Sequence, residues 1–459
     1  MYDLIIIGAG SAGISAYKEA VKHTDNLLII NDGPWDTTCA RVGCMPSKVL
    51  ISTANRMYDI QHSDNLGLVV DAKIDTQQVM THVQNLRDRF TKATLKDVNA
   101  WPEKHKISGR AHFIDAETIE VNGQQLKAKH FILAVGSTPQ YDAELKQQLG
   151  DRLLTSDEIF ELPQLPQSIA VIGSGVIAIE LAQAMHRLGV KTDIFARSRK
   201  VGALSSPNLQ KLAQETLSQE LNLHFETLPK HYQKQDAQVH IEFEKNGTNQ
   251  TIDVDYVLSA TGRRSLLSSL KLNQINPQFE DLKKLPVDAK TKQLADLPIF
   301  IVGDAHTQTP LQHEASHEGR EAAKNCLKNQ ELTTIKTLTP LGIVFCDPEM
   351  ASVGQNYKQL TDASISFVTG MVDYTKQGRA LTMGKNRGSA EIYICKESRK
   401  ILGAEFFCPA AEHFAHTLAW LISENVTVDD VLAQPFYHPT LEEGLRTALK
   451  HARRQLPFK

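Results

Sequence analysis

Apolar residues along the chain fall into short runs that end in glycine, and two of these runs open the same pattern. LIIIGAGSAGISAYKEAVKH at 4–23 gives a strand, a glycine-rich turn and helical spacing, and NLLIIND at 26–32 gives a second strand. SIAVIGSGVIAIELAQAMHRLGVKTDIFAR at 168–197 repeats this order. Such units form parallel sheets that bind dinucleotides. The pattern therefore predicts an α/β protein with two Rossmann-like dinucleotide-binding domains.

The pattern changes towards the C-terminus. DYVLSATGRR at 255–264 and LPIFIVGDA at 297–305 still end apolar strands in glycine. GSAEIYICKESRKILGAEFF at 388–407 instead predicts two antiparallel strands joined by a polar turn at 396–398, and residues 410–433 have helical spacing. We therefore expect a C-terminal α+β module. The predicted domains are 1–145 with 265–335, which holds the first glycine turn, 146–264, which holds the second, and 336–459 at the C-terminus.

Composition limits the classes of function. The 459 residues carry a formal net charge of −3, which does not indicate binding to nucleic acid or to an anionic membrane. No apolar run approaches the roughly 20 residues of a membrane span, and the N-terminus lacks the pattern of a signal peptide. Six cysteines are too few for a secreted disulfide scaffold. A cytoplasmic protein is expected, in which a lasting disulfide is more often catalytic than structural.

Each glycine turn has the chemistry of a phosphate site. In GAGSAG at 8–13 the first glycine makes the turn, the second lets the backbone approach a pyrophosphate, and the third allows close helix packing. GSGVIA at 173–178 has alanine at the third position. Arg197 follows the second strand of that unit, with Arg199 and Lys200 nearby, where an NAD site usually has an acid. This favours a 2′-phosphate, and thus NADP(H), although a solvated basic turn is the alternative.

Two cysteines lie five positions apart in DTTCARVGCMPSKVL at 36–50. Zinc would need a second cluster, and the other four cysteines are isolated, as expected of small buried hydrophobes. No metal site is predicted. Pro46 suits the first turn of a helix that contains Lys48, and both a helix N-terminus and a lysine favour the attacking thiolate. A redox role for Cys39 and Cys44 is therefore preferred over zinc ligands or unrelated buried thiols.

The motifs together resemble a known family from end to end. They are GAGSAG, CARVGCMPSK, AVGSTP, GSGVIAIE, ATGR, VGDA, DPEMASVG and HPTLEE, in this order. The chain is similar to the FAD-containing pyridine nucleotide–disulfide oxidoreductases, in the branch of dihydrolipoamide dehydrogenase and glutathione reductase. The resemblance implies FAD on the first turn, NAD or NADP on the second, and a homodimer formed by the C-terminal domain.

The resemblance also implies which residues contact each cofactor. FAD would be bound by Gly8, Gly10, Gly13, Asn31, Lys48, Ala111, Gly136, Gly303 and Asp304. NAD(P) would be bound by Gly173, Gly175, Ala178, Glu180, Arg197, Arg199 and Gly262. Asn31 departs from the acid that the family usually has for the adenosine ribose, and DTTC replaces the usual double glycine before the first cysteine.

The catalytic residues follow from the same resemblance. Cys44 would lie against the flavin, and Cys39 would exchange with substrate. Lys48 would lie beside the flavin and pair with Glu180. His438 would serve as the base for the cysteine pair of the other subunit. Pro439 is expected to begin a helix from which Glu443 reaches back to the imidazole of His438.

The predicted function is exchange of electrons between a dithiol or disulfide, dihydrolipoamide or lipoamide being favoured, and NAD(P), with a place in cell redox homeostasis. One alternative is an NADPH-dependent reductase of another, glutathione-type disulfide. The other is a docking subunit of a 2-oxoacid dehydrogenase complex. The ending HARRQLPFK has no cysteine pair, which argues against mercuric reductase.

Overall fold

The computed structural model describes residues 1–306, 310–328 and 331–457. Packing divides the chain into two compact units. The first comprises Met1–Pro46, His82–Gln140 and Gly262–Thr337, and the second comprises Ser47–Thr81, Tyr141–Thr261 and Leu338–Lys459. The three predicted domains with their boundaries stay a prediction. The second unit holds both the second glycine turn and the C-terminal strands.

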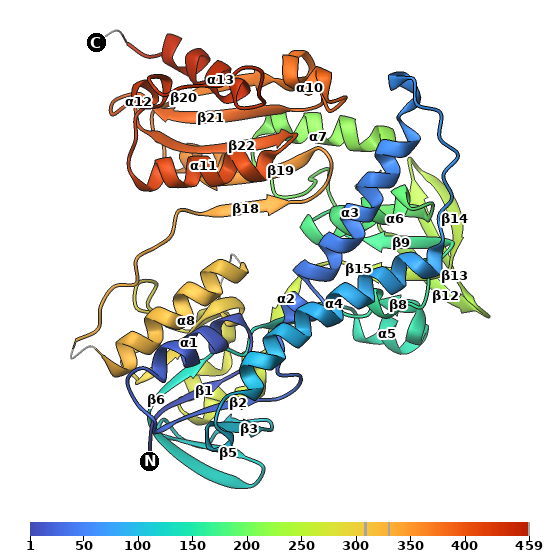
Figure 1. The fold of residues 1–459 in the computed structure, drawn as a ribbon. Coiled ribbons are helices and arrows are strands. Elements are labelled where there is room, and N and C mark those ends of the chain that lie inside the picture. Colours follow the sequence, from blue (N-terminus) through green and yellow to red (C-terminus); the bar gives the residue numbers. More distant parts are fainter. Residues whose placement is uncertain (307–309, 329–330, 458–459) are drawn as a thin grey trace. The chain divides into compact units, whose positions relative to one another are not determined.

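A mainly parallel sheet forms the centre of the first unit (Figure 1). Its order is β3-β2-β1-β6-β5-β4, and β17 pairs with β6. The strands are β1 Tyr2–Ile7, β2 Leu27–Asn31, β3 Lys106–Ser108, β4 His112–Phe113, β5 Thr118–Val121, β6 Gln124–Leu133 and β17 Ile299–Ile301. A small antiparallel pair is formed by β7 Ser137–Pro139 and β16 Arg263–Ser265.

Strand β1 is buried on both faces, as its continuous apolar run predicts. Leu4 and Ile6 pack on the side of helices α1, Ser11–Ala20, and α8, Gln312–Leu327, while Ile5 and Ile7 pack into the core on the other face. Helices α1 and α8 lie side by side (Figure 1). A Cβ on Gly319 of α8 would lie 2.1 Å from the Ala12 carbonyl oxygen, so the helices touch through their backbones.

The second glycine turn belongs to a parallel sheet of order β11-β10-β9-β15-β8 in the second unit. Its strands are β8 Leu153–Leu154, β9 Ser168–Ile172, β10 Lys191–Ala196, β11 Asn222–Phe225 and β15 Tyr256–Ser259. The helices here are α5 Ala143–Leu149, α6 Val176–Arg187 and α7 Pro207–Glu220. An antiparallel meander is formed by β12 Pro229–Gln235, β13 Gln238–Lys245 and β14 Thr248–Val254. Both predicted strand–turn–helix–strand units are confirmed.

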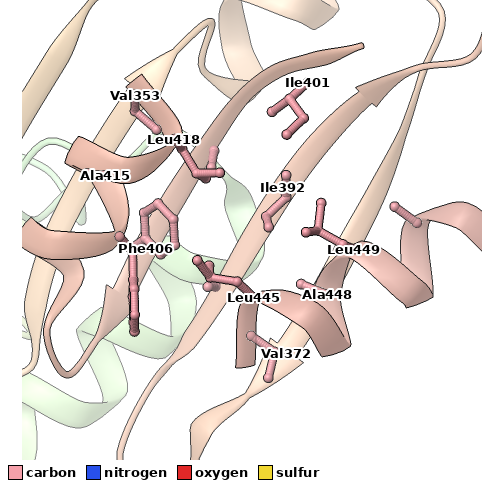
Figure 2. Close-up of a cluster of buried hydrophobic side chains, with 14 of the residues drawn as sticks. Val353, Val372, Ile392, Ile401, Phe406, Ala415, Leu418, Leu445, Ala448 and Leu449 are labelled. Atoms are coloured by element: carbon pink, nitrogen blue, oxygen red, sulfur yellow. The ribbon is translucent and has the colours of Figure 1, made fainter. Parts of the chain in front are cut away.

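The C-terminal module of the second unit is an antiparallel sheet of order β18-β19-β22-β21-β20. Its strands are β18 Leu341–Val344, β19 Glu349–Gly354, β20 Phe367–Asp373, β21 Ser389–Cys395 and β22 Ile401–Cys408. Helices α11, Ala411–Ser423, and α13, Glu443–Arg454, share one core with this sheet; Figure 2 shows Leu418 and Leu445 beside Phe406 of β22. The predicted hairpin is confirmed.

Three short helices complete this module: α9 Tyr357–Asp362, α10 Gly378–Thr382 and α12 Val428–Leu432. The predicted helical segment is thus two helices, α11 and α12. Thr427 separates them because its side chain caps the second helix in a capping box with Asp430. Among the described residues, no helix is long and apolar enough to cross a bilayer.

Candidate active site

The two cysteines lie at adjoining helix ends in the first unit. Cys39 is in α2, Thr38–Arg41, and Cys44 is the first residue of α3, Cys44–Gln61. The chain between them folds back tightly, since a Cβ on Gly43 would lie 3.2 Å from the Cys39 Cα. Cys39 is half-buried and Cys44 is exposed. The predicted helix with Pro46 in its first turn is confirmed, and its N-terminal amide groups favour negative charge at Cys44.

Lys48, one turn after Cys44 in α3, forms an ion pair with Glu180 of α6. The Lys48 Nζ to Glu180 Oε2 distance is 2.8 Å, and the Glu180 side chain is only 5% exposed. The other carboxylate oxygen of Glu180 accepts from the Phe345 backbone N–H at 2.8 Å. The Lys48 ammonium also lies 4.5 Å from the centre of the Phe345 ring. The lysine is therefore held at a defined place by a buried carboxylate and an aromatic face.

His438 and Glu443 also pair in the second unit. The His438 Nδ1 lies 3.0 and 3.1 Å from the two carboxylate oxygens of Glu443, while the His438 side chain is 80% exposed. The hydrogen bond from His438 lowers the pKa of Glu443, and the Thr440 backbone N–H acts in the same direction. Because Nδ1 donates to this carboxylate, Nε2 is left to accept a proton.

The expectation that Pro439 begins a helix is wrong. Helix α13 begins at Glu443, and the His438–Pro439 peptide is cis. A turn precedes the helix because the Thr440 hydroxyl donates to the Tyr437 carbonyl oxygen at 2.8 Å. Glu443 consequently reaches His438 from the first helical residue.

The first glycine turn has the cradle that a dinucleotide phosphate requires. Gly8 adopts φ +108°, and a Cβ there would lie 2.3 Å from the Ala134 carbonyl oxygen. A Cβ on Gly13 would lie 1.8 Å from the Gly8 carbonyl oxygen. At Gly10, in contrast, a Cβ would find open space within 4 Å among the described residues. The second glycine thus faces a space over the N-terminus of α1, which fits a pyrophosphate.

Asn31 at the end of β2 closes this turn. Its Oδ1 accepts from the Ala9 backbone N–H at 2.9 Å, and its Nδ2 donates to the carbonyls of Gly33 and Pro34 at 3.1 and 2.8 Å. Next to it, Asp32 pairs with Arg110 at 2.6 Å, both exposed. Asn31 therefore fixes the loops around this turn.

The remaining predicted flavin contacts also belong to the first unit. Ala111 is buried, and Gly136 adopts φ +69° with open space at its Cβ position among the described residues. Asp304 is largely buried, and burial raises its pKa, against the opposing effects of Arg263 and Ser137. The Ser137 hydroxyl lies 3.4 Å from an Asp304 oxygen. These groups fit the polar, non-phosphate part of a flavin nucleotide.

The second glycine turn repeats the cradle. Gly173 adopts φ +124°, with a Cβ position 2.5 Å from the Ala260 carbonyl oxygen, and Gly175 has open space within 4 Å among the described residues. Ala178 is fully buried. Gly262, also predicted to contact NAD(P), adopts φ +127° but belongs to the first unit. The turn fits a second dinucleotide.

The predicted basic residues lie beside this second turn. Arg197, Arg199 and Lys200 are all exposed. Their segment is tied to the turn because the Ser174 hydroxyl donates to the Lys200 carbonyl at 2.7 Å and the Gly202 N–H donates to the Ser174 carbonyl at 2.8 Å. Arg199 is only loosely engaged, 3.8 Å from an exposed Glu226.

Several supporting residues were missed by the sequence analysis. The buried Glu318 accepts from the Gly303 N–H at 2.8 Å and pairs with Lys292 at 2.8 Å, which fixes Gly303 at φ +63°. Gln183 and Arg187 of α6 are buried with Glu180. The polar positions 180, 183 and 187 in an otherwise apolar helix were the available signal.

Three of the isolated cysteines, Cys326, Cys346 and Cys408, are buried as predicted, whereas Cys395 is half-buried. Within residues 1–306, 310–328 and 331–457, no group of three His, Cys, Asp or Glu side chains is placed to hold a metal ion.

Comparisons with family models and with curated proteins indicate the same family. The family model for pyridine nucleotide-disulphide oxidoreductase matches residues 2–319, and the model for the dimerisation domain of that family matches residues 341–449. The dihydrolipoyl dehydrogenase of Geobacillus stearothermophilus is 30% identical over 96% of this chain and 94% of its own length. A mercuric reductase of Staphylococcus aureus is 27% identical over 97% of this chain and 82% of its own.

Solved structures share the fold. LpdA from Mycobacterium tuberculosis superposes with a TM-score of 0.83 at 22% identity, covering 99% of this chain and 100% of its own. The HOCl-induced flavoprotein disulfide reductase RclA from Escherichia coli gives 0.79 at 17% identity, covering 98% and 99%. The predicted fold class is confirmed.

Proposed function

Since the chain belongs to the pyridine nucleotide–disulfide oxidoreductase family, whose enzymes use FAD and a nicotinamide cofactor, we propose that it exchanges electrons between dihydrolipoamide or lipoamide and NAD(P). The observation that carries the proposal is the start of α3. There Cys44 opens the helix, Cys39 lies in the preceding one, and Lys48 one turn on pairs with the buried Glu180. The dihydrolipoyl dehydrogenase relatives, aligned over nearly the whole chain, support the choice of substrate.

The first half-reaction needs only the residues of the protein. A substrate thiolate attacks Cys39 in the oxidised pair, which forms a mixed disulfide and releases Cys44 as a thiolate. The second substrate thiol gives its proton to Nε2 of His438 and attacks the substrate sulfur of the mixed disulfide. The substrate leaves as a disulfide, and both cysteines remain reduced. Glu443 stabilises the imidazolium that forms.

The second half-reaction returns the pair to the disulfide as NAD(P)⁺ becomes NAD(P)H and a proton is released. FAD supplies the path for the electron pair between the thiols and the nicotinamide. Lys48, held by Glu180, would supply a positive charge that stabilises the anionic reduced flavin. The homodimer, supported by the dimerisation domain, is needed because His438 would act on Cys39 of the partner subunit.

A second candidate is an NADPH-dependent reductase of another disulfide, favoured by the basic turn at Arg197. A panel of dihydrolipoamide, lipoamide, glutathione disulfide and Hg²⁺, each tested with both nicotinamide cofactors, separates the two. Turnover of lipoamide or dihydrolipoamide at least about tenfold above the others supports the proposal, and turnover confined to glutathione disulfide or Hg²⁺ contradicts it.

Variants of the cysteines test the chemistry. Cys39→Ser should abolish dithiol turnover but keep a long-wavelength thiolate-to-flavin absorption band, whereas Cys44→Ser should lose both. Cys395→Ser, a half-buried cysteine in the C-terminal sheet, is the matched control and should change neither. Equal spectra of the Cys39 and Cys44 variants would contradict the assigned order of the thiols.

A variant of the histidine tests the proton transfer. His438→Ala should lower dithiol turnover by about 10²-fold or more, the range of general acid–base catalysis, without loss of bound flavin. An unaltered rate would take His438 out of the mechanism.

A further inference from the structure

Three of the four polar residues in helix α6 form one buried stripe along the helix. Glu180, Gln183 and Arg187 are spaced i, i+3 and i+7, which places them on one face of the helix. They are 5%, 3% and 3% exposed. Buried polar groups of this size are kept only where they find partners, and all three find partners in one segment of the C-terminal module.

That segment is the turn Phe345–Asp347, which joins β18 to β19. The Phe345 N–H donates to Glu180 at 2.8 Å. The Asp347 N–H donates to the Gln183 Oε1 at 2.8 Å, and the Gln183 Nε2 returns a hydrogen bond to the Asp347 carbonyl at 2.9 Å. The Arg187 Nη1 donates to the Asp347 Oδ2 at 3.0 Å. Each residue of the stripe therefore holds the turn.

The same network holds α3. The Arg187 Nη1 donates to the Asn55 Oδ1 at 2.7 Å, and its guanidinium lies 3.8 Å from the centre of the Tyr58 ring. Arg387 donates to the Asp347 Oδ2 at 2.9 Å and to the Tyr58 hydroxyl at 3.1 Å. Asn55 and Tyr58 lie about two and three turns beyond Lys48 in this helix. In this network, the Asp347 carboxylate accepts from both Arg187 and Arg387.

The charges of the network balance around Asp347. Arg187 and Arg387 are opposed by Asp347 and by Glu220, which accepts from the Arg187 Nη2 at 3.0 Å. Burial alone would raise the pKa of Asp347, but Arg387 and Arg187 outweigh it and lower the pKa. Removal of this one negative charge would leave two arginines against one glutamate, with the Arg187 side chain only 1% exposed.

We propose that Asp347 is a positioning residue for the Lys48–Glu180 pair. Through Arg187 and Arg387 it fixes α3, which carries Lys48, and through its backbone contacts with Gln183 it fixes the turn whose Phe345 N–H and ring meet Glu180 and Lys48. The inference rests on the proposed function, since it assumes that Lys48 acts on the bound flavin. It makes the C-terminal module part of the electron-transfer apparatus as well as of the dimer.

The test is the midpoint potential of the bound flavin in the holoenzyme, measured with a reference dye and no dithiol. Lys48→Met should make this potential more negative, because it removes a cation that stabilises the anionic reduced flavin. Asp347→Asn, nearly equal in volume, should shift it in the same direction, and the double variant should shift it by less than the sum. Turnover with the dithiol should fall on the order of tenfold or more in Asp347→Asn, as expected of misplaced catalytic geometry.

Two further variants separate positioning from general stability. Glu349→Gln alters a half-buried carboxyl two residues along, which accepts from the Glu412 N–H of α11 at 3.0 Å; it should leave the potential unchanged. Gln183→Met keeps every charge but removes both hydrogen bonds to residue 347, and should shift the potential even if Asp347→Asn fails to fold.

The outcomes distinguish the two proposals. If Lys48→Met moves the potential while the folded Asp347→Asn and Gln183→Met proteins do not, the role of Asp347 is refuted and the proposed function stands. If Lys48→Met leaves the potential unchanged, the role of Lys48 fails and this inference fails with it.

Discussion

The two glycine turns, one in each unit, have nearly the same backbone. Gly10 has φ −79° and ψ −167°, and Gly175 has φ −76° and ψ −170°. The N–H of the first glycine of each turn donates to the strand that follows the helix. Gly8 donates to the Ile30 carbonyl of β2 at 2.7 Å, and Gly173 donates to the Phe195 carbonyl of β10 at 2.9 Å. The turns differ in side chains: Gly13 against Ala178, Asn31 against Ala196, and Asp32 against Arg197 at the next position. We therefore expect the backbone of each turn to form a phosphate site, and the residues around it to decide how closely the helix packs and which nucleotide fits.

The largest expected effect concerns the third position of the turn. Gly13→Ala should destabilise the first unit by about 2 kcal/mol or more, because the new Cβ would lie 1.8 Å from a backbone oxygen that cannot move away cheaply. Ala178→Gly in the second unit should cost only about 1 kcal/mol, the usual penalty of glycine within a helix. Thermal unfolding and flavin content measure both. Equal losses of stability in the two variants would mean that α1 and α6 pack equally closely against their turns.

A smaller effect is expected at the second position. Alanine is compatible with the backbone of Gly10 and Gly175, and its Cβ meets open space among the described residues. Gly10→Ala should weaken FAD binding to the apoprotein about tenfold or more, equivalent to about 1.4 kcal/mol, and leave the stability of the apoprotein unchanged. Gly175→Ala should instead raise KM for the nicotinamide cofactor and leave FAD in place. Loss of FAD from the Gly175 variant would contradict this separation.

The basic turn should decide the nicotinamide cofactor. Arg197→Glu should lower the ratio of kcat/KM for NADPH to that for NADH by about tenfold or more, since a hydrogen bond to a charged group contributes about 1.5–3 kcal/mol. Lys191→Glu, an exposed cation at the opposite end of β10, is the control and should leave the ratio unchanged. A ratio that responds equally to both variants would show only a general effect of charge.

The smallest effect is the pH dependence of the first unit at Asp304. Burial raises the pKa of this carboxyl above its ordinary value of 3.8. The native state then holds the proton to higher pH than the unfolded chain, so this contribution to stability is complete below pH 3.8 and is lost as the pH rises through the folded-state pKa. Asp304→Asn should therefore raise Tm of the apoprotein relative to wild type by more at pH 7 than near pH 3.8, where the wild-type carboxyl still holds its proton in the folded state. A Tm difference between the variant and the wild type that does not change with pH would contradict a raised pKa of Asp304.

Local signals in the sequence were sufficient for the elements of both dinucleotide units. An apolar run, three small residues at fixed spacing and a helical pattern each specify backbone conformation within a few residues. The start of α13 was placed wrongly because the turn at Tyr437–Thr440 is closed by a hydroxyl-to-carbonyl hydrogen bond that no propensity indicates. The pairing of Lys48 with Glu180, 132 positions apart, followed only from the family resemblance.

The chain by itself determined where the two glycine turns, the helix that carries Cys44 and the C-terminal hairpin would form, because each depends on residues close together in sequence. Only the tertiary structure decided that Gln183 and Arg187 would hold Asp347, and that Glu318 would hold Gly303. Those contacts join segments that the fold brings together, and a buried polar group reveals its purpose only when its partner is in place.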